Sequence, residues 1–110
     1  GVRPFGTSLL IAGYQKSTNE CCIYQCDPAG TYFAWNAVEI GENSDAYLKT
    51  LEQIYLNEMT VEEAIETALK VLNDKSSYTI SAKSVDIAIV DNNGVDILSE
   101  EDKDVYIRQI

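Results

Sequence analysis

The sequence predicts an α+β fold in which the strands pair as antiparallel hairpins. Up to Gly41, apolar side chains recur with a period of two, which is typical of strands. From Ser44 to Leu72 they recur with a period of 3.6, which is typical of amphipathic helices. Two further strand-like segments and an acidic, capped helix follow. Because the connections are short and carry turn residues, the expected order is strands, two helices, two strands and a helix.

A polar hairpin loop is expected to join the first two strands. Residues Thr7 to Ala12 are mainly β-branched or aliphatic and end at Gly13, and Cys21 to Cys26 continue with period two. The polar segment Gln15 to Glu20 is the expected loop between them. Alternate side chains of a strand point to opposite faces. One face should therefore carry Cys22, Tyr24 and Cys26, and the other Cys21, Ile23 and Gln25.

A turn leads into the third expected strand. In Asp27-Pro28-Ala29-Gly30 the aspartate can accept bonds from the backbone ahead of it, the proline fixes φ and the glycine accepts a positive φ. The strand is expected to run from Tyr32 to Ile40. Phe33 and Trp35 share one face of it and Tyr32 lies on the other. Burial in a core or an interface is the expected role of these aromatic side chains.

Two amphipathic helices are expected next, and their short link predicts an antiparallel pair. The first lies between Ser44 and Asn57, with Asn43 or Ser44 as its N-cap. Its apolar stripe is Tyr47, Leu48, Leu51, Ile54 and Tyr55. The second opens with a capping box, Thr60 to Glu63, and ends at the polar break from Asn73 to Ser77. Its expected inward side chains are Val61, Ala64, Ile65, Ala68, Leu69 and Leu72.

The chain is expected to close with a hairpin and a short helix. Val85 to Val90 alternate, and Asp91-Asn92-Asn93-Gly94 turn this strand into Val95 to Leu98. Ser99 then caps a helix whose first turn, Glu100 to Asp102, suits the positive end of the helix dipole. A single helix layer covers only one face of a sheet. At least one sheet face should therefore need a cover from outside this chain.

Composition and charge exclude several classes of function. The formal net charge of −10 repels a phosphate backbone, so neither nucleic acid nor an anionic membrane is an expected partner. No apolar stretch approaches the roughly 20 residues of a membrane span, and no secretory signal is visible, so we expect a soluble protein. Cys21, Cys22 and Cys26 form an odd, crowded set that indicates reduced thiols and a cytosolic or nuclear compartment.

Candidate catalytic and metal-binding groups are few. The sequence has no histidine, which removes Ser-His and Cys-His pairs and histidine-containing zinc sites. The cysteines lack a fourth ligand and face opposite ways, so packing is their expected role. The carboxylates Glu62, Glu63 and Glu66, and those of Glu100 to Asp104, lie in the first turns of expected helices, where capping and solvation explain them. We therefore expect no catalytic, cofactor-binding or metal-ligating residue, and no cofactor.

Four segments carry a resemblance to a known family. They are GVRPFGTSLLIAGY, YQCDPAGTYFAWNAVEIGEN, TVEEAIETALKVL and VDIAIV with its hairpin and closing helix. In this order and spacing, across essentially the whole chain, they resemble proteasome alpha-type subunits. RPFG and YFAW are most similar to the second alpha type. Catalytic beta subunits usually carry a GG-containing stretch where this chain has Ala37 to Gly41, so the alpha resemblance is preferred.

The resemblance implies a fold, a role and a set of partners. Residues 1–110 would be a single partial domain, the C-terminal portion of an alpha-type subunit and the later part of a four-layer α/β/β/α N-terminal-nucleophile-hydrolase-like sandwich. Such subunits are non-catalytic and form the outer seven-membered ring of the 20S core. The ring gates substrate entry in ATP- and ubiquitin-dependent protein degradation. The implied partners are other alpha subunits, beta-ring subunits and a regulatory particle or activators, in the cytoplasm and nucleus.

An enzymatic alternative rests on the Gly6-Thr7 junction. Active relatives release an N-terminal threonine by cleavage after glycine, and its free amine helps to activate the hydroxyl. In those relatives an Asp and a Lys follow the threonine by about 16 and 32 residues. Those offsets fall on Ile23 and Glu39 here. A threonine-type hydrolase that uses Thr7 is therefore the alternative, and a threonine that opens a strand is preferred.

Overall fold

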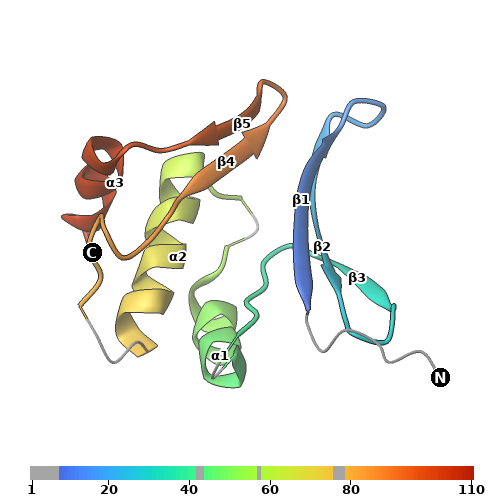
Figure 1. The fold of residues 1–110 in the computed structure, drawn as a ribbon, viewed down its shortest axis with the longest axis horizontal. Coiled ribbons are helices and arrows are strands. Elements are labelled where there is room, and N and C mark those ends of the chain that lie inside the picture. The colour runs from blue at the N-terminus through green and yellow to red at the C-terminus, as the bar shows by residue number, and fades with distance from the viewer. Residues whose placement is uncertain (1–7, 42–43, 57, 76–78) are drawn as a thin grey trace.

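The computed structural model describes residues 8–41, 44–56, 58–75 and 79–110 (Figure 1). Its elements follow the predicted order and confirm the α+β class with antiparallel sheets. They are β1 (Leu9–Gln15), β2 (Glu20–Cys26), β3 (Tyr32–Trp35), α1 (Ser44–Ile54), α2 (Val61–Lys75), β4 (Ala88–Asp91), β5 (Gly94–Ile97) and α3 (Glu100–Ile107). None of the helices in these described ranges combines the length and the hydropathy that a membrane span needs.

The first sheet has the strand order β1-β2-β3, and both of its strand pairs are antiparallel. The turn before β3 forms as predicted, because Asp27 Oδ1 accepts hydrogen bonds from the backbone N–H groups of Ala29 (3.0 Å) and Thr31 (2.9 Å). Gly30 adopts a φ of 87°, which only glycine accepts readily. Local side-chain chemistry therefore fixes this connection.

In the first sheet, the ends of β1 and β3 differ from the predictions. β1 continues through Gly13 to Gln15, because Gly13 still pairs with Cys22 across the hairpin. β3 ends at Trp35 rather than Ile40. Asparagine is a poor strand former, and the chain bends at Asn36 and leaves the sheet toward the helices. Asn36 to Glu39 therefore line a cavity instead of extending the sheet.

The capping box of α2 is present as predicted. The Thr60 hydroxyl accepts from the backbone N–H of Glu63 (3.1 Å), and the Glu63 carboxylate accepts from the Thr60 N–H (3.2 Å). These two bonds satisfy backbone donors at the start of the helix, where no intrahelical partner exists. The predicted N-cap Asn43 and the predicted helix end Asn57 lie outside the described residues. At its other end, α2 continues to Lys75, three residues into the expected break.

The inward face of α2 was predicted only in part. Ile65 and Leu69 are buried, but Val61, Ala64 and Ala68 are exposed. Val71 was not predicted to face inward and is buried. The reason is that α2 has apolar neighbours on two sides, and the predicted apolar stripe of the helix accounts for only one of these sides.

A small core holds the second half of the chain together. Ile65, Leu69 and Ile80 are buried in contact with one another. Partly buried side chains pack around them: Leu72, Val85, Ile87, Ile89, Leu98, Tyr106, Ile107 and Ile110. The β4–β5 hairpin and α3 thereby cover one side of α2, as Figure 1 shows. β4 begins later than the predicted Val85, although the Leu98 N–H still donates to the Ile87 carbonyl (2.9 Å).

The turn between β4 and β5 and the N-cap of α3 form as the sequence predicts. Asp91 Oδ1 accepts from the Asn93 N–H (2.8 Å), and Gly94 has a φ of 104°. Ser99 Oγ accepts from the Asp102 N–H (3.2 Å) and so caps α3. Both hydrogen bonds join residues that are close in sequence, which is why the sequence reveals them.

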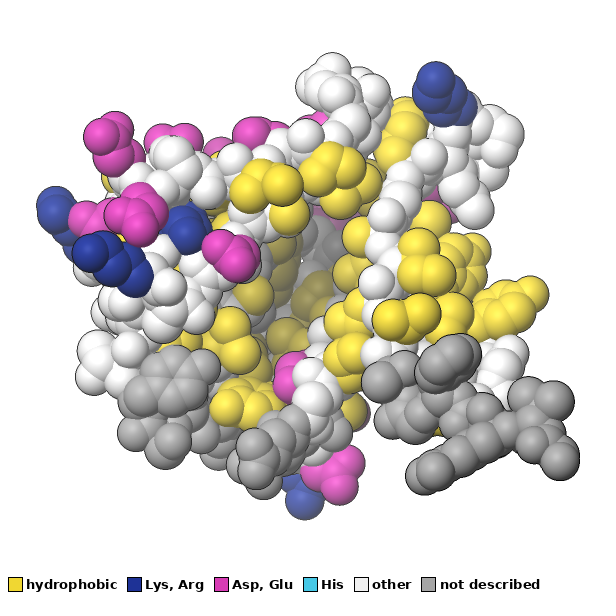
Figure 2. Space-filling view, in the orientation of Figure 1, with side chains coloured by type: hydrophobic (Ala, Val, Ile, Leu, Met, Phe, Trp, Pro, Cys, Tyr) yellow, Lys and Arg dark blue, Asp and Glu magenta, His cyan; other side chains and the backbone are white. Residues whose placement is uncertain are grey.

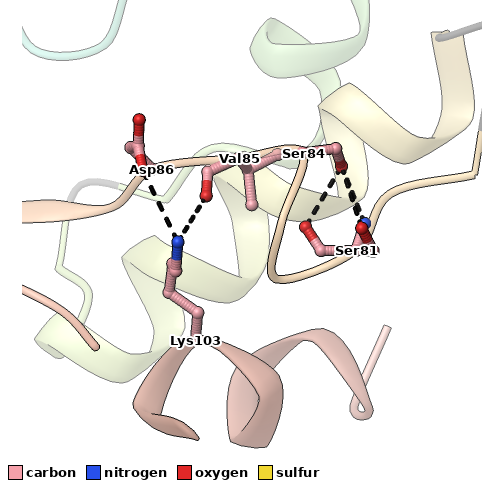
Figure 3. A network of polar contacts seen from close by, with 5 residues as sticks. All are labelled: Ser81, Ser84, Val85, Asp86 and Lys103. Atoms are coloured by element: carbon pink, nitrogen blue, oxygen red, sulfur yellow. Dashed lines mark hydrogen bonds and ion pairs between the residues drawn. The ribbon is translucent and has the colours of Figure 1, made fainter. Parts of the chain in front are cut away.

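Lys103 is a buried charged side chain that ties α3 to the segment before β4 (Figure 3). Its Nζ donates to the Val85 carbonyl (2.8 Å) and lies 3.5 Å from Asp86 Oδ1. The Asp86 side chain is 98% exposed, so its attraction is screened by water. The bond to the carbonyl is therefore the more important of the two.

Replacing Lys103 with methionine should destabilise the fold by about 1–3 kcal/mol, because the half-buried Val85 carbonyl loses its donor. Chemical denaturation of the variant measures this. Asp86→Asn is the matched control and should change stability much less, since the aspartate is solvated. Equal losses in the two variants would contradict this ranking.

Candidate interaction surface

One face of the first sheet has no described element packed against it. The register places the polar Gln15 and Glu20 at the hairpin end of this outer face and seven further side chains along it: Leu9, Ile11, Cys22, Tyr24, Cys26, Tyr32 and Ala34. The opposite, inner face points toward the rest of the chain, since Ile23 and Trp35 line cavities shared with the helices. Figure 1 shows the helices and the β4–β5 hairpin to the left of this sheet and no described element to its right.

The outer face is apolar and open to solvent. Leu9 is 58%, Ile11 52% and Tyr32 67% exposed. Tyr24 and Tyr32 contact each other edge to face, with ring centroids 6.3 Å apart. Contiguous apolar surface of this kind marks an interaction site in a soluble protein. Figure 2 shows hydrophobic side chains gathered over the strands on this side of the molecule.

The whole chain exposes more surface than a compact monomer of its size. Its accessible surface is 8286 Å², whereas a folded chain of this length should expose about 6,100 Å². The radius of gyration is 15.1 Å, against about 13 Å for a compact domain. The excess area exceeds the roughly 800 Å² that one partner contributes to a standard interface. The exposed apolar side chains of the outer face are suited to burial against other polypeptide.

Further apolar side chains are exposed on the hairpin and on α3. Val95 and Ile97 share the face of the hairpin turned away from the core, and Ile97 is 73% exposed. Val105 on α3 is also exposed. Sequence reasoning placed Val95 and Ile97 on a strand but did not identify this surface, because burial depends on what the tertiary fold covers.

Between the inner face of the sheet and the helices lies a mainly apolar cavity of about 340 Å³. Its walls include Ile23 from β2, Leu51 from α1, and Ala68 and Val71 from α2. Glu39 also lines the cavity. Partial burial raises the pKa of the Glu39 carboxyl above its ordinary value of 4.5, because desolvation disfavours the charged form.

The residues considered for nucleophilic chemistry are not assembled into a site by the described structure. Thr7 lies outside the described residues. Ile23 and Glu39, at the offsets where active relatives carry Asp and Lys, line the apolar cavity. The glutamate carries the opposite charge to the lysine of active relatives.

The three cysteines are free thiols on two faces of β2, as predicted. Cys21 Sγ donates to the Val90 carbonyl across to β4 (3.7 Å), and Cys22 Sγ donates to the Gly13 carbonyl (3.5 Å). Within the described ranges, no group of three or more Cys, Asp or Glu side chains is arranged to hold a metal ion.

The acidic clusters serve the helices and also line grooves. Glu63 closes the capping box, and Asp104 pairs with Arg108 one turn later (2.8 Å). Glu62 and Glu66 line a groove between α2, β5 and α3 together with Asp96, Asp102 and apolar side chains. The sequence did not reveal this groove, because its carboxylates come from three separate elements.

Four tyrosines outside the first sheet have different surroundings. Tyr47 and Tyr55 on and after α1 are half-buried, and Tyr55 lines the apolar cavity. Tyr106 packs against the core, so its position is structural. Tyr78 lies outside the described residues. Phe33 and Trp35 lie on the inner face and remain exposed, so the rest of the described chain leaves part of that face uncovered.

Comparison with known proteins identifies the family. A family model described as "Proteasome subunit" matches residues 1–90. The chain belongs to the proteasome subunit family. It is similar to the proteasome subunit alpha type-2 of Caenorhabditis elegans, at 38% identity over 102 residues, which are 92% of this chain and 44% of the relative. The resemblance to alpha-type subunits, and to the second alpha type among them, is confirmed.

Two further alpha type-2 subunits of the proteasome show the same relation. That of Trypanosoma brucei brucei is 38% identical over 110 residues, covering 100% of this chain and 47% of the relative. That of Oryza sativa subsp. indica is 42% identical over 90 residues, covering 82% and 37%. The chain therefore spans less than half the length of these proteasome relatives.

Replacing both Ile11 and Tyr32 with lysine should weaken self-association of the chain through the outer face at least ten-fold. The reason is that two exposed apolar side chains no longer gain from burial. Sedimentation velocity over a concentration series measures this. Thr18→Lys combined with Asn92→Lys adds the same charge at two exposed turns and should have little effect. An equal loss in this control would show that net charge, and not the outer face, controls association.

Proposed function

We propose that this chain is part of a non-catalytic subunit of the outer alpha ring of the 20S proteasome core. The observation that carries the proposal is the match to alpha type-2 subunits along 82–100% of the chain. The open apolar faces support it, because a ring subunit must bury surface against neighbours on several sides. Residues 1–110 are proposed to be one partial domain of that subunit.

The absence of catalysis is part of the proposal. The sequence has no histidine, and a glutamate stands where an active relative would carry its lysine. A glutamate at that position cannot act as the cation that lowers the pKa of a threonine nucleophile. The alternative, a threonine-type hydrolase that uses Thr7, is not favoured because the matched relatives are alpha-type subunits. No catalytic, cofactor-binding or metal-ligating residue is proposed.

The proposed role in the particle follows from the ring. A subunit of the outer ring supports gated entry of unfolded polypeptide into the proteolytic chamber and so contributes to ATP- and ubiquitin-dependent degradation. Its proposed partners are the other alpha subunits, the beta-ring subunits, and a regulatory particle or activators on the ring surface. The net charge of −10 argues against nucleic acid and anionic membranes as partners. Cytoplasm and nucleus are the proposed compartments.

The full-length subunit that contains this chain should enter a ring-shaped hetero-oligomer. Affinity purification followed by size-exclusion chromatography with mass measurement tests this. We expect the subunit to elute with other proteasome subunits at the mass of the assembled core. A strictly monomeric subunit that never enters such a particle would contradict the proposal.

Replacing Thr7 with alanine should leave the peptidase activity of the assembled particle unchanged within two-fold, because Thr7 is proposed to be a strand residue and not a nucleophile. Mass spectrometry of the wild-type subunit provides the control: the Gly6-Thr7 bond should stay intact, and a threonine-directed electrophile should not label Thr7. Cleavage at this bond with labelling of Thr7 would instead support the hydrolase.

A further inference from the structure

The Glu39 carboxylate has one oxygen that is buried without a hydrogen-bond partner. Although the residue as a whole is half-buried, Oε2 is shielded from solvent and unpaired among the described residues. The other oxygen, Oε1, lies toward Gly41, where an added Cβ would be 3.5 Å away. Burying a carboxylate oxygen without a partner is costly, so most such atoms in folded proteins have one.

Two cavities meet at Glu39, and none of the described side chains that line them is basic. The apolar cavity of about 340 Å³ lies on one side. A second cavity, of about 530 Å³, lies on the other and is lined by Ser8, Gln25, Ile40, Gly41, Asp45 and Leu48 as well as by Glu39. Asp45 therefore adds a second carboxylate. The charge that complements this region is positive.

The walls of the apolar cavity favour a polypeptide occupant. Ile23 from the inner face of the sheet faces Ala68 and Val71 of α2, so an inserted segment would contact apolar side chains on both sides. The polar groups at its edge are few, and Glu39 carries the only acidic side chain in the described lining. Apolar walls with a single carboxylate match an apolar segment that carries a single cation.

We propose that this cavity is filled by an apolar segment of the same longer subunit, and that one lysine or arginine of that segment pairs with Glu39. The chain spans less than half the length of its alpha type-2 relatives, so a subunit of their length contains ample further polypeptide. The inference rests on the proposed function to that extent. A second copy of this chain is a poor occupant, because its net charge is also −10.

The position of the cavity decides between the same subunit and a neighbouring one. It is lined by residues of the first sheet on one side and of the helix pair on the other, and both walls belong to one chain. A neighbouring subunit would instead meet the outer face of the sheet or the exposed side of the β4–β5 hairpin. A segment of the same subunit is therefore the occupant that fits an interior site.

The proposal can be tested on the full-length subunit with Glu39→Gln, Glu39→Ala and Glu39→Lys. Removing one partner of a buried ion pair should lower the thermal midpoint by about 5 °C or more in the first two variants. Glu39→Lys places two cations together and should reduce the recovered folded subunit at least ten-fold. Glu58→Lys at an exposed position is the matched control and should behave like the wild type. Unchanged or raised midpoints for Glu39→Gln and Glu39→Ala would overturn the pairing.

An experimental structure of the assembled particle identifies the partner. We expect a lysine Nζ or an arginine guanidinium of the same subunit within 4 Å of a Glu39 oxygen. A basic group from another subunit, a water molecule alone, or no partner at that distance would overturn the proposal. If the wild-type subunit never enters a ring, the proposed function fails, but the thermal comparison still tests the pairing on the free subunit.

Discussion

Burial of one side of helix α2 against the β4–β5 hairpin and α3 is the packing interaction on which the rest of the structure depends. Ile65 and Leu69 join Ile80 in the small core, and the Lys103 bond to the Val85 carbonyl ties α3 to the same assembly. Since this side of α2 is occupied, its other side faces the first sheet. The packing thereby creates the apolar cavity and fixes which face of the sheet stays open.

Local chemistry explains what the sequence predicted well. The Thr60 capping box, the Asp27 turn and the Ser99 cap each depend on side chains within a few residues, and all three form with the expected donors and acceptors. The period-two pattern of Cys21 to Cys26 likewise assigned the correct faces of β2. These features require no knowledge of the distant chain, so sequence patterns are sufficient.

Tertiary packing explains what the sequence did not reveal. The burial of Val71 requires an apolar neighbour on a second side of α2, and the early end of β3 at Trp35 moves the following residues toward the helices. The burial of Lys103 likewise depends on a carbonyl 18 residues away. At the candidate site, the unpaired Glu39 oxygen appears only when sheet and helices are placed together. Charge and periodicity contain no signal for such juxtapositions.

The pairing of each described strand with its neighbour in sequence has a consequence for how the subunit acquires its structure. β1 pairs with β2, β2 with β3, and β4 with β5, so every described hairpin closes a short loop. Such contacts form quickly, because little chain entropy is lost before they are made. The two sheets can therefore form early, while the outer face of the first sheet is still uncovered. A chain whose outer face is still uncovered is prone to aggregate.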